Sequence, residues 1–356
     1  MAIAKFGKPA KLADVAKAAG VSPGTVSNVF NRPGVVRAEV QERVRTVAQR
    51  LGYRADPKGR LLRAGKVNAI GVATVEPLSH FFQDPFARIL MTGVTEAAQA
   101  NGAGVSLVSA ANTAELAWNV RNALVDGFIL FCLEGSHELI RSATERNLPF
   151  VALGLTQEDE SISVVGIDDV AGARDVAKHL ADLGHRRFAI LSMKLTEHGC
   201  GRAALEKVER TTYSTSRERV QGYFEALAGY GVDTITIPIF ETQNDELTVR
   251  AALEEIFAAP NPPTAILAQS DRIALIALDW LRARGIAVPR DVSIVGFDGV
   301  PESATSTPPL TTVVQPIAEI GRRAVNAILE FDGTITRQTV DVSLLVRSST
   351  APPPSA

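Results

Sequence analysis

Apolar positions near the start of the chain recur at helical spacing and predict three short helices between residues 12 and 51. The positions that share an apolar face are Leu12, Val15, Ala16 and Ala19 in the first segment, Val26 and Val29 in the second, and Val40, Val44, Val47 and Leu51 in the third. Gly20 suits the left-handed residue that ends a helix, and Ser22 and Pro23 suit the cap and first position of the next one. The pattern therefore predicts a small all-α unit.

The second predicted helix carries polar positions on the face opposite its valines. The positions that the pattern directs toward solvent are Pro23, Gly24, Thr25, Ser27 and Asn28. Two short helices joined by a tight turn, with a polar outer face, are the arrangement of a helix-turn-helix unit that enters the DNA major groove. Two helices of an ordinary bundle give the same pattern, so the pattern alone leaves both interpretations open.

From Val67 onward, short apolar runs alternate with helical patterns and predict buried parallel strands. The first series of predicted strands covers 68–73, 104–109, 127–132 and 149–153, and the second covers 188–191, 234–239, 265–269 and 293–297. Two such series indicate an α/β body of two doubly wound parallel-sheet subdomains.

Ligands of doubly wound folds bind outside the carboxyl ends of the strands, here in the cleft expected between the two subdomains. This rule selects Val75 and Glu76, Phe131 and Cys132, Gly154 and Leu155, Phe240 and Glu241, Ser270 and Asp271, and Asp298. Phe81, Phe82 and Phe86 follow the first strand, where they either wall a pocket or pack in the core.

Charge is divided unevenly along the chain. Residues 1–66 hold 14 Lys and Arg against four acids, a net charge of +10, whereas the whole chain carries −2. A basic head on an acidic body favours a polyanionic partner for the head, with a merely solvated basic arm as the alternative. Two cysteines, five scattered histidines and the lack of an 18-residue apolar run predict no disulfide framework, metal site or membrane partner.

Enzyme chemistry is not expected. The chain has no GxGxxG at the first helix of the body, no GxxxxGK[ST], and no nucleophile–His–acid set, so neither a catalytic residue nor a cofactor is predicted. The start, MAIAKFGKPAK, lacks the apolar core of a signal peptide, which favours a cytoplasmic protein over an exported solute-binding protein.

The helical segment also resembles a known family. The matching residues are Asp14-Val15-Ala16, Ala19-Gly20-Val21-Ser22, Thr25-Val26-Ser27, Val29, Asn31 and Leu51-Gly52-Tyr53. They resemble the headpiece motif of the LacI/GalR family of bacterial transcriptional regulators, and the resemblance extends to about Ser348. It implies a helix-turn-helix headpiece, a periplasmic-binding-protein-like body, and a sequence-specific regulator whose operator affinity a small effector controls. Repression is the commoner mode in the family.

The resemblance implies a division of the chain. The expected parts are a basic leader at 1–10, the headpiece at 11–55, a hinge segment at 56–66, an effector-binding and dimerisation domain at 67–350 and a tail at 351–356. Within the body, 67–166 and 296–325 are expected in the first subdomain, and 167–295 and 326–350 in the second. No heptad helix follows the body, so a homodimer is expected.

Two sets of site residues follow from the resemblance. The expected DNA contacts are Ser22, Pro23, Gly24, Thr25, Ser27, Asn28, Asn31, Tyr53, Arg60 and Leu62. Leu62 stands where family members wedge a leucine into the minor groove, although 56–66 also fits a flexible linker. The expected effector contacts are Val75, Phe86, Phe131, Gly154, Arg219, Phe240, Ser270 and Asp298.

Arg219, in Arg219-Val220-Gln221-Gly222, and Asp298 match the family's usual ligand-binding cation and acid; the alternatives are a surface cation and a cap. Val75, Phe131 and Gly154 stand where sugar-binding members place polar groups. This favours an effector less polar on that side than a free hexose, and the alternative is an effector held there by main chain and water.

Two further segments are marked by the comparison with the family. Residues 194–216 are longer than the family norm and form either a flap over the cleft or a surface insertion. Residues 310–316 match the strand that returns between the subdomains.

Overall fold

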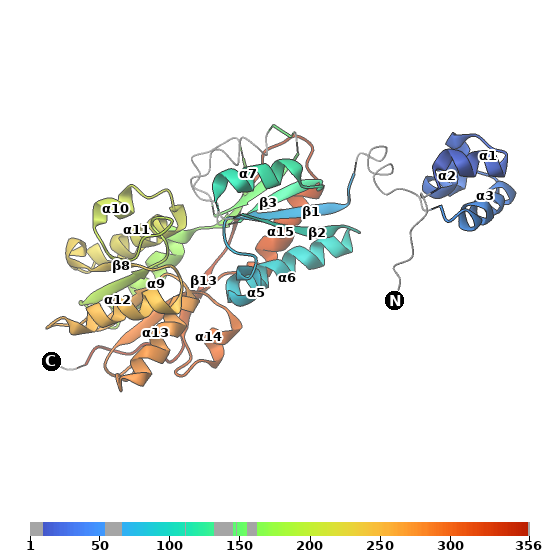
Figure 1. Ribbon diagram of the computed structural model, residues 1–356. Helices are drawn as coiled ribbons and strands as arrows, with labels where there is room; N and C mark the ends of the chain where they lie inside the picture. The colour runs from blue at the N-terminus through green and yellow to red at the C-terminus, as the bar shows by residue number, and fades with distance from the viewer. Residues whose placement is uncertain are drawn as a thin grey trace. The chain divides into compact units, whose positions relative to one another are not determined.

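The computed structural model describes residues 10–53, 66–110, 112–131, 145–146, 148–154 and 162–354. The chain divides into two compact units, Met1–Val67 and Asn68–Ala356, called the headpiece and the body below (Figure 1). Residues 1–9 of the expected leader and 56–65 of the expected hinge, including Arg60 and Leu62, lie outside the described residues.

The described headpiece is built from helices around a valine-rich core. Its elements are α1 (Leu12–Ala19), α2 (Pro23–Asn31), the 3₁₀ turn η1 (Pro33–Val35) and α3 (Ala38–Arg50). Gly20 ends α1 with a φ of 67°, and the Ser22 hydroxyl accepts a hydrogen bond from the Thr25 N–H at 3.1 Å. The core predicted from the apolar pattern is confirmed except at Leu51, which caps α3 and is 38% exposed.

The first subdomain of the body contains an all-parallel sheet in the order β12-β5-β4-β3-β1-β2. Its strands are β1 (Ala69–Thr74), β2 (Gly104–Ser109), β3 (Gly127–Leu130), β4 (Phe150–Leu153), β5 (Ser163–Ile167) and β12 (Arg337–Val340). The helices α6 (Pro85–Ala100) and α15 (Ile317–Leu329) share one apolar core with it, and α7 (Thr113–Asn122) packs in a separate core. The short helix α5 (His80–Gln83) precedes α6.

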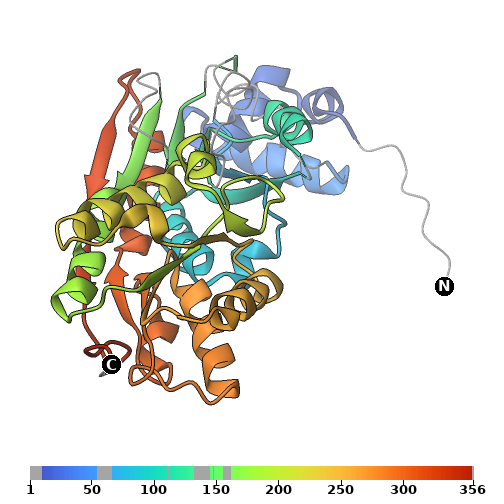
Figure 2. The same cartoon turned by 90° about the vertical axis from the view of Figure 1, so that its left-hand side faces the viewer.

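The second subdomain contains a sheet in the order β13-β11-β10-β9-β6-β8-β7, antiparallel only at its two edges. Its strands are β6 (Phe188–Ser192), β7 (Gly201–Ala203), β8 (Ile239–Glu241), β9 (Ala265–Ala268), β10 (Ser293–Asp298), β11 (Thr311–Val314) and β13 (Ser343–Leu345). Its remaining elements are α9 (Asp169–Asp182), α10 (Leu205–Glu209), α11 (Ser214–Ala228), η2 (Thr234–Thr236), α12 (Glu246–Ala258), α13 (Asp271–Ala283) and α14 (Pro301–Thr305). Helices α9 and α11 line one core, and α12 and α13 line another (Figure 2).

The doubly wound parallel fold is confirmed, but the expected subdomain boundaries are wrong. Strands β10 and β11 pair within the second sheet, and β12 pairs with β5 in the first. The chain therefore passes between the subdomains after β5, after β11 and after β12. Residues 296–314 belong to the second subdomain, whereas α15 and β12 belong to the first.

Two smaller expectations also fail. The strand expected at 234–239 begins instead as η2, because the Asp233 side chain accepts a hydrogen bond from the Ile235 N–H, and only 239–241 pair as β8. The expected tail begins as part of the body, since the buried ring of His185 hydrogen-bonds the Ala351 carbonyl at 2.8 Å.

Helices α6 and α15 cross at two glycines. A Cβ at Gly93 would lie 1.9 Å from the Ala318 carbonyl oxygen, and one at Gly321 would lie 2.6 Å from the Leu90 carbonyl oxygen. These distances are too short for any side chain, so the helices approach backbone to backbone. The close approach fixes α6 against the sheet.

Gly93→Ala is expected to lower the free energy of unfolding by about 2 kcal/mol, because the added methyl forces the two helices apart. Gly104→Ala is the control, since its Cβ would meet only the Asn68 carbonyl oxygen at 3.9 Å. Urea unfolding of both variants measures the difference. Equal stability of Gly93→Ala and the parent chain would contradict the tight crossing.

Candidate functional site

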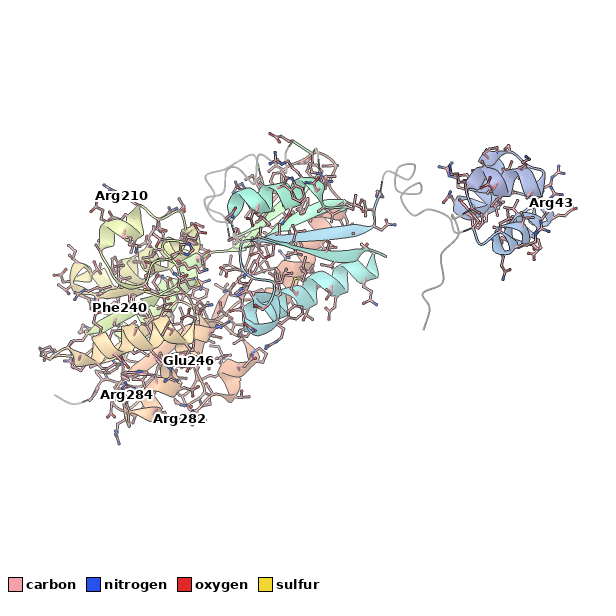
Figure 3. The ribbon with its side chains drawn as sticks, viewed as in Figure 1. Arg43, Arg210, Phe240, Glu246, Arg282 and Arg284 are labelled. Atoms are coloured by element: carbon pink, nitrogen blue, oxygen red, sulfur yellow. The ribbon has the colours of Figure 1, made fainter. Side chains whose placement is uncertain are left out.

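The outer face of α2 holds most of the expected DNA contacts. Pro23, Gly24 and Asn28 are exposed, as is Asn31 at the end of the helix. Exposed cations such as Arg43 on α3 add positive charge to the same unit (Figure 3). This arrangement offers polar side chains on a short helix that a small core holds rigid.

Three of the expected contacts, Ser27, Thr25 and Tyr53, are engaged inside the headpiece. Ser27 is only 6% exposed, so the prediction that it faces solvent is wrong; its carbonyl and hydroxyl accept hydrogen bonds from the Asn31 amide at 2.9 and 3.2 Å. Thr25 is half-buried and its hydroxyl bonds that of Ser22. Tyr53 is half-buried against Phe30, with ring centroids 5.7 Å apart.

Arg219 is the buried cation of the body. It lies on α11, is 4% exposed, and donates from Nε to Asp169 of α9 at 2.7 Å. A second nitrogen donates to the Gln269 carbonyl that follows β9, and the guanidinium lies 3.6 Å from the ring centroid of Phe297. Burial of a charge is tolerated only with such partners. The alternative of a helix-surface cation is thereby excluded.

Asp298 ends β10 beside this guanidinium, 4.0 Å from Arg219 Nη1. Its carboxylate accepts from the Asp271 N–H at 3.1 Å and from the Gln315 amide at 2.9 Å. Its φ of 142° is a conformation that residues with side chains rarely adopt and that costs about 1–3 kcal/mol. The structure thus brings the two residues of the expected cation–acid pair together at the carboxyl edge of the second sheet.

The electrostatics of this edge are dominated by burial. Desolvation raises the pKa of Asp298 well above its usual value, the neighbouring Asp271 raises it further, and Arg219 lowers it. Asp271 is also buried, and its carboxylate accepts from the N–H groups of Gly299 and Val300 at 2.8 and 2.9 Å. A set of acids that outnumbers its cation favours a ligand that donates hydrogen bonds.

Gln269 is a residue of this site that the sequence analysis missed. Its buried side chain accepts from Ser192 and from the Met193 N–H, and donates to the Ser216 carbonyl at 2.9 Å. It therefore ties the ends of β6 and β9 to the start of α11 and positions Arg219. The sequence offered only its place at the end of an apolar run.

The other expected effector contacts are dispersed. Phe131 follows β3 and its ring stacks on that of Phe86, 6.2 Å apart with an interplanar angle of 9°, within the apolar core of the first subdomain. Val75 follows β1, the strand that pairs with β3, and is half-buried. Gly154 uses its carbonyl to accept from Ser214 at 2.8 Å.

Two of these residues have roles other than the expected one. Phe240, labelled in Figure 3, is 2% exposed and packs with Val249 and Leu253 of α12, in a core that contains no residue of α11. Ser270 caps α13 through the Ile273 N–H and donates its hydroxyl to Asn244 at 2.7 Å. Neither side chain joins the Arg219–Asp298 pair.

Residues 194–216 form an ordered segment. They include β7, which pairs with β8, and α10. The buried carboxylate of Glu241 accepts from the Leu195 and Thr196 N–H groups and from Lys207, which fastens the segment to the second subdomain. Lys194 in turn bonds Glu76 after β1, so the segment also reaches the first subdomain.

The described residues contain no cluster of His, Cys, Asp and Glu that would hold a metal ion. Among the same residues, no helix is long and apolar enough to cross a bilayer.

A small helical unit with an exposed polar helix, joined in one chain to a doubly wound body of two subdomains, is the architecture of a DNA-binding regulator. Residues 11–56 match the model of bacterial regulatory proteins of the lacI family, and 177–350 match that of a periplasmic binding protein-like domain. The chain belongs to the LacI family of transcriptional regulators. Its known relatives are named as regulators and not as enzymes.

Individual relatives cover nearly the whole chain. The HTH-type transcriptional regulator Rv3575c of Mycobacterium tuberculosis is 37% identical over 97% of this chain and 98% of its own length. The lac repressor dimer bound to operator and the anti-inducer ONPF matches with a TM-score of 0.77 at 25% identity, over 97% of this chain and 100% of that one. The complex of the regulator CelR with cellobiose matches with a TM-score of 0.69 at 28% identity, over 96% and 99%.

A titration is expected at Glu218, next to Arg219. Burial raises the pKa of this half-buried carboxyl to about 7, and Asp169 adds to the rise. Since the folded chain holds this proton more tightly than the unfolded one, stability decreases as the pH rises from about 4.5 to 7. Glu218→Gln removes that loss and is expected to stabilise the protein at pH 8, on the order of 1 kcal/mol after screening, but not at pH 4.5.

Thermal unfolding of the parent chain and Glu218→Gln at both pH values measures this difference. Glu209→Gln, an exposed change on the nearby α10, is the control. A stabilisation by Glu218→Gln that is equal at pH 4.5 and pH 8 would refute the titration.

Proposed function

We propose that this regulator represses transcription as a homodimer and that a small molecule bound beside Arg219 and Asp298 controls its affinity for operator DNA. The observation that carries the proposal is the buried Arg219–Asp298 pair, held at the carboxyl edge of a doubly wound sheet by groups that leave it little freedom. This edge is where such folds bind ligands. A strained, nearly fully buried acid is typical of a ligand site.

The proposed effector is a sugar or a related metabolite that donates hydrogen bonds. Asp298, Asp169 and Asp271 offer acceptors, and CelR, a relative in structure, is described in complex with cellobiose. On the first-subdomain side, the proposed contacts Val75, Phe86, Phe131 and Gly154 offer apolar surface and main chain. An effector less polar on that side therefore suits the site better than one with hydroxyls on every side.

The proposed DNA contacts are the exposed residues of α2 together with Tyr53 and, in the hinge segment, Arg60 and Leu62. Support comes from the match to the lacI family model over 11–56 and from the charge of +10 over 1–66. The structurally similar lac repressor is described as a dimer on its operator. Operator binding would place the protein with the DNA, in the cytoplasm.

Affinity for an operator selected from a random duplex library is expected to fall at least 1,000-fold, about three decades, between 50 and 200 mM salt. The reason is that two headpieces of high positive charge release many counterions from the phosphates. Fluorescence anisotropy over a salt series measures the slope. An affinity independent of salt would refute a phosphate-dominated interface.

Asp298→Asn is expected to remove the effector response and keep operator affinity. The amide keeps the size of the carboxylate but loses half of its acceptor capacity, which weakens effector binding by about 1.5–3 kcal/mol, or roughly tenfold to a hundredfold. A thermal-shift screen of a metabolite library on the full chain identifies a ligand, and titration then compares the variant with the parent.

Glu209→Gln is the control for a general effect of charge. Equal affinity of the Asp298→Asn variant and the parent for the identified ligand would place the effector elsewhere. No stabilising metabolite and no ligand-dependent change in operator affinity would contradict the proposed function itself.

A further inference from the structure

The first turn of α6, in the first subdomain, is bound by side chains of the second subdomain. Asp84 caps α6 by accepting from the Ala87 N–H at 3.0 Å through Oδ1. Its other oxygen, Oδ2, accepts from Asn244 at 3.2 Å and from Arg272 of α13 at 3.4 Å. Asp84 is 4% exposed, so one buried carboxylate both caps α6 and binds residues of the second subdomain.

Asn244 hydrogen-bonds both Asp84 and the residue that caps a second helix, α13. Its amide nitrogen donates to Asp84, while its amide oxygen accepts from the hydroxyl of Ser270, which caps α13. Asn244 has a φ of 57°, a left-handed conformation that Asn tolerates better than most residues. One side chain therefore joins the caps of two helices that belong to different subdomains.

We propose that Asp84, Asn244 and Ser270 form a latch that holds the two subdomains together and couples their separation to Asp298. The residue after Ser270 is Asp271, whose N–H donates to the Asp298 carboxylate. Hydrogen bonds thus connect Asp84 to Ser270 through Asn244. The peptide bond from Ser270 to Asp271 and the hydrogen bond from Asp271 to Asp298 complete the connection to the proposed effector site. Any ligand that moves Asp298 moves the latch.

Charge supports the same coupling. The carboxylate of Asp84 is one of the groups that raise the pKa of Asp298, after burial and Asp271. Repulsion between the carboxylates of Asp84 and Asp298 favours separation of the two subdomains. Arg272, which forms an ion pair with Asp84, opposes that repulsion. A further ion pair, Arg88–Glu302, joins the same turn of α6 to α14 but is about half exposed, so it contributes less.

The latch itself concerns the body alone, whereas its regulatory consequence rests on the proposed effector response. A ligand that binds one arrangement of the subdomains better than the other shifts their equilibrium only by that difference in affinity. The latch sets the fraction of molecules in the joined arrangement when no ligand is bound. Weakening it is expected to lower the affinity for any ligand that favours the joined arrangement, by the factor by which the population of that arrangement falls.

Two substitutions test the latch in the full-length chain. Asp84→Asn keeps the cap of α6, because the amide oxygen still accepts from Ala87, but it turns a donor toward Asn244 and Arg272, which are themselves donors. Asn244→Gly removes the bridge and suits the left-handed backbone. Asp245→Asn is the matched control, since Asp245 caps α12 from the same loop and its described contacts stay within the second subdomain.

Backbone hydrogen–deuterium exchange, followed by mass spectrometry, reads the result without any effector. Both latch variants are expected to raise exchange about tenfold in the first turn of α6 and also in residues 299–303 of the second subdomain. Asp245→Asn is expected to raise it only at the start of α12. If Asn244→Gly leaves α6 unchanged, or if Asp84→Asn acts only within residues 84–91, the proposal is overturned.

Discussion

The carboxyl edge of the second sheet depends on burying one guanidinium. Arg219 comes from α11, its acid partner Asp169 from α9, its carbonyl acceptor from the end of β9, and its aromatic neighbour Phe297 from β10. A buried charge costs several kcal/mol unless each of these partners is in place. The four elements therefore have to adopt one relative arrangement, and Gln269, which follows β9, also fixes the start of α11 by donating to the Ser216 carbonyl. Asp298 acquires its unusual backbone within that frame.

Helix α6 belongs to the first subdomain and also contacts the second. Its middle lies against α15 at Gly93, where no side chain fits, so the helix moves with the first sheet. Its first turn is held by groups of the second subdomain, namely Asn244 and Arg272. A rigid element fixed at one part and hydrogen-bonded at another converts a small change at a polar contact into a displacement of the subdomain. The proposed latch relies on this property of α6.

Local rules predicted the headpiece and most of the strands. Ser22, Pro23 and Gly20 gave the bounds of α1 and α2 because capping and left-handed geometry are decided within a few residues. Membership of a sheet is decided by distant partners, so the placement of β10, β11 and β12 could not be predicted from apolar runs.

The same distinction applies to the site. Arg219 and Asp298 could be predicted from a family motif and a strand end. The role of Ser270 could not, because it depends on Asn244, a lone polar residue in a loop. Phe240 satisfied the strand-end rule, but the side chain points to the wrong face of the sheet, which the rule does not distinguish.

The three passages of the chain between the subdomains limit how the body can deform. After β5, β11 and β12 at most two residues lead to the first element in the other subdomain, which is α9, α15 or β13 respectively. Three short tethers allow a bending motion in which all three flex together, but they resist sliding and twisting, which would stretch one tether relative to the others. Deleting or inserting a single residue in one tether would change its length alone. The body would then be biased toward one side of its bend without any change at the ligand or at the DNA.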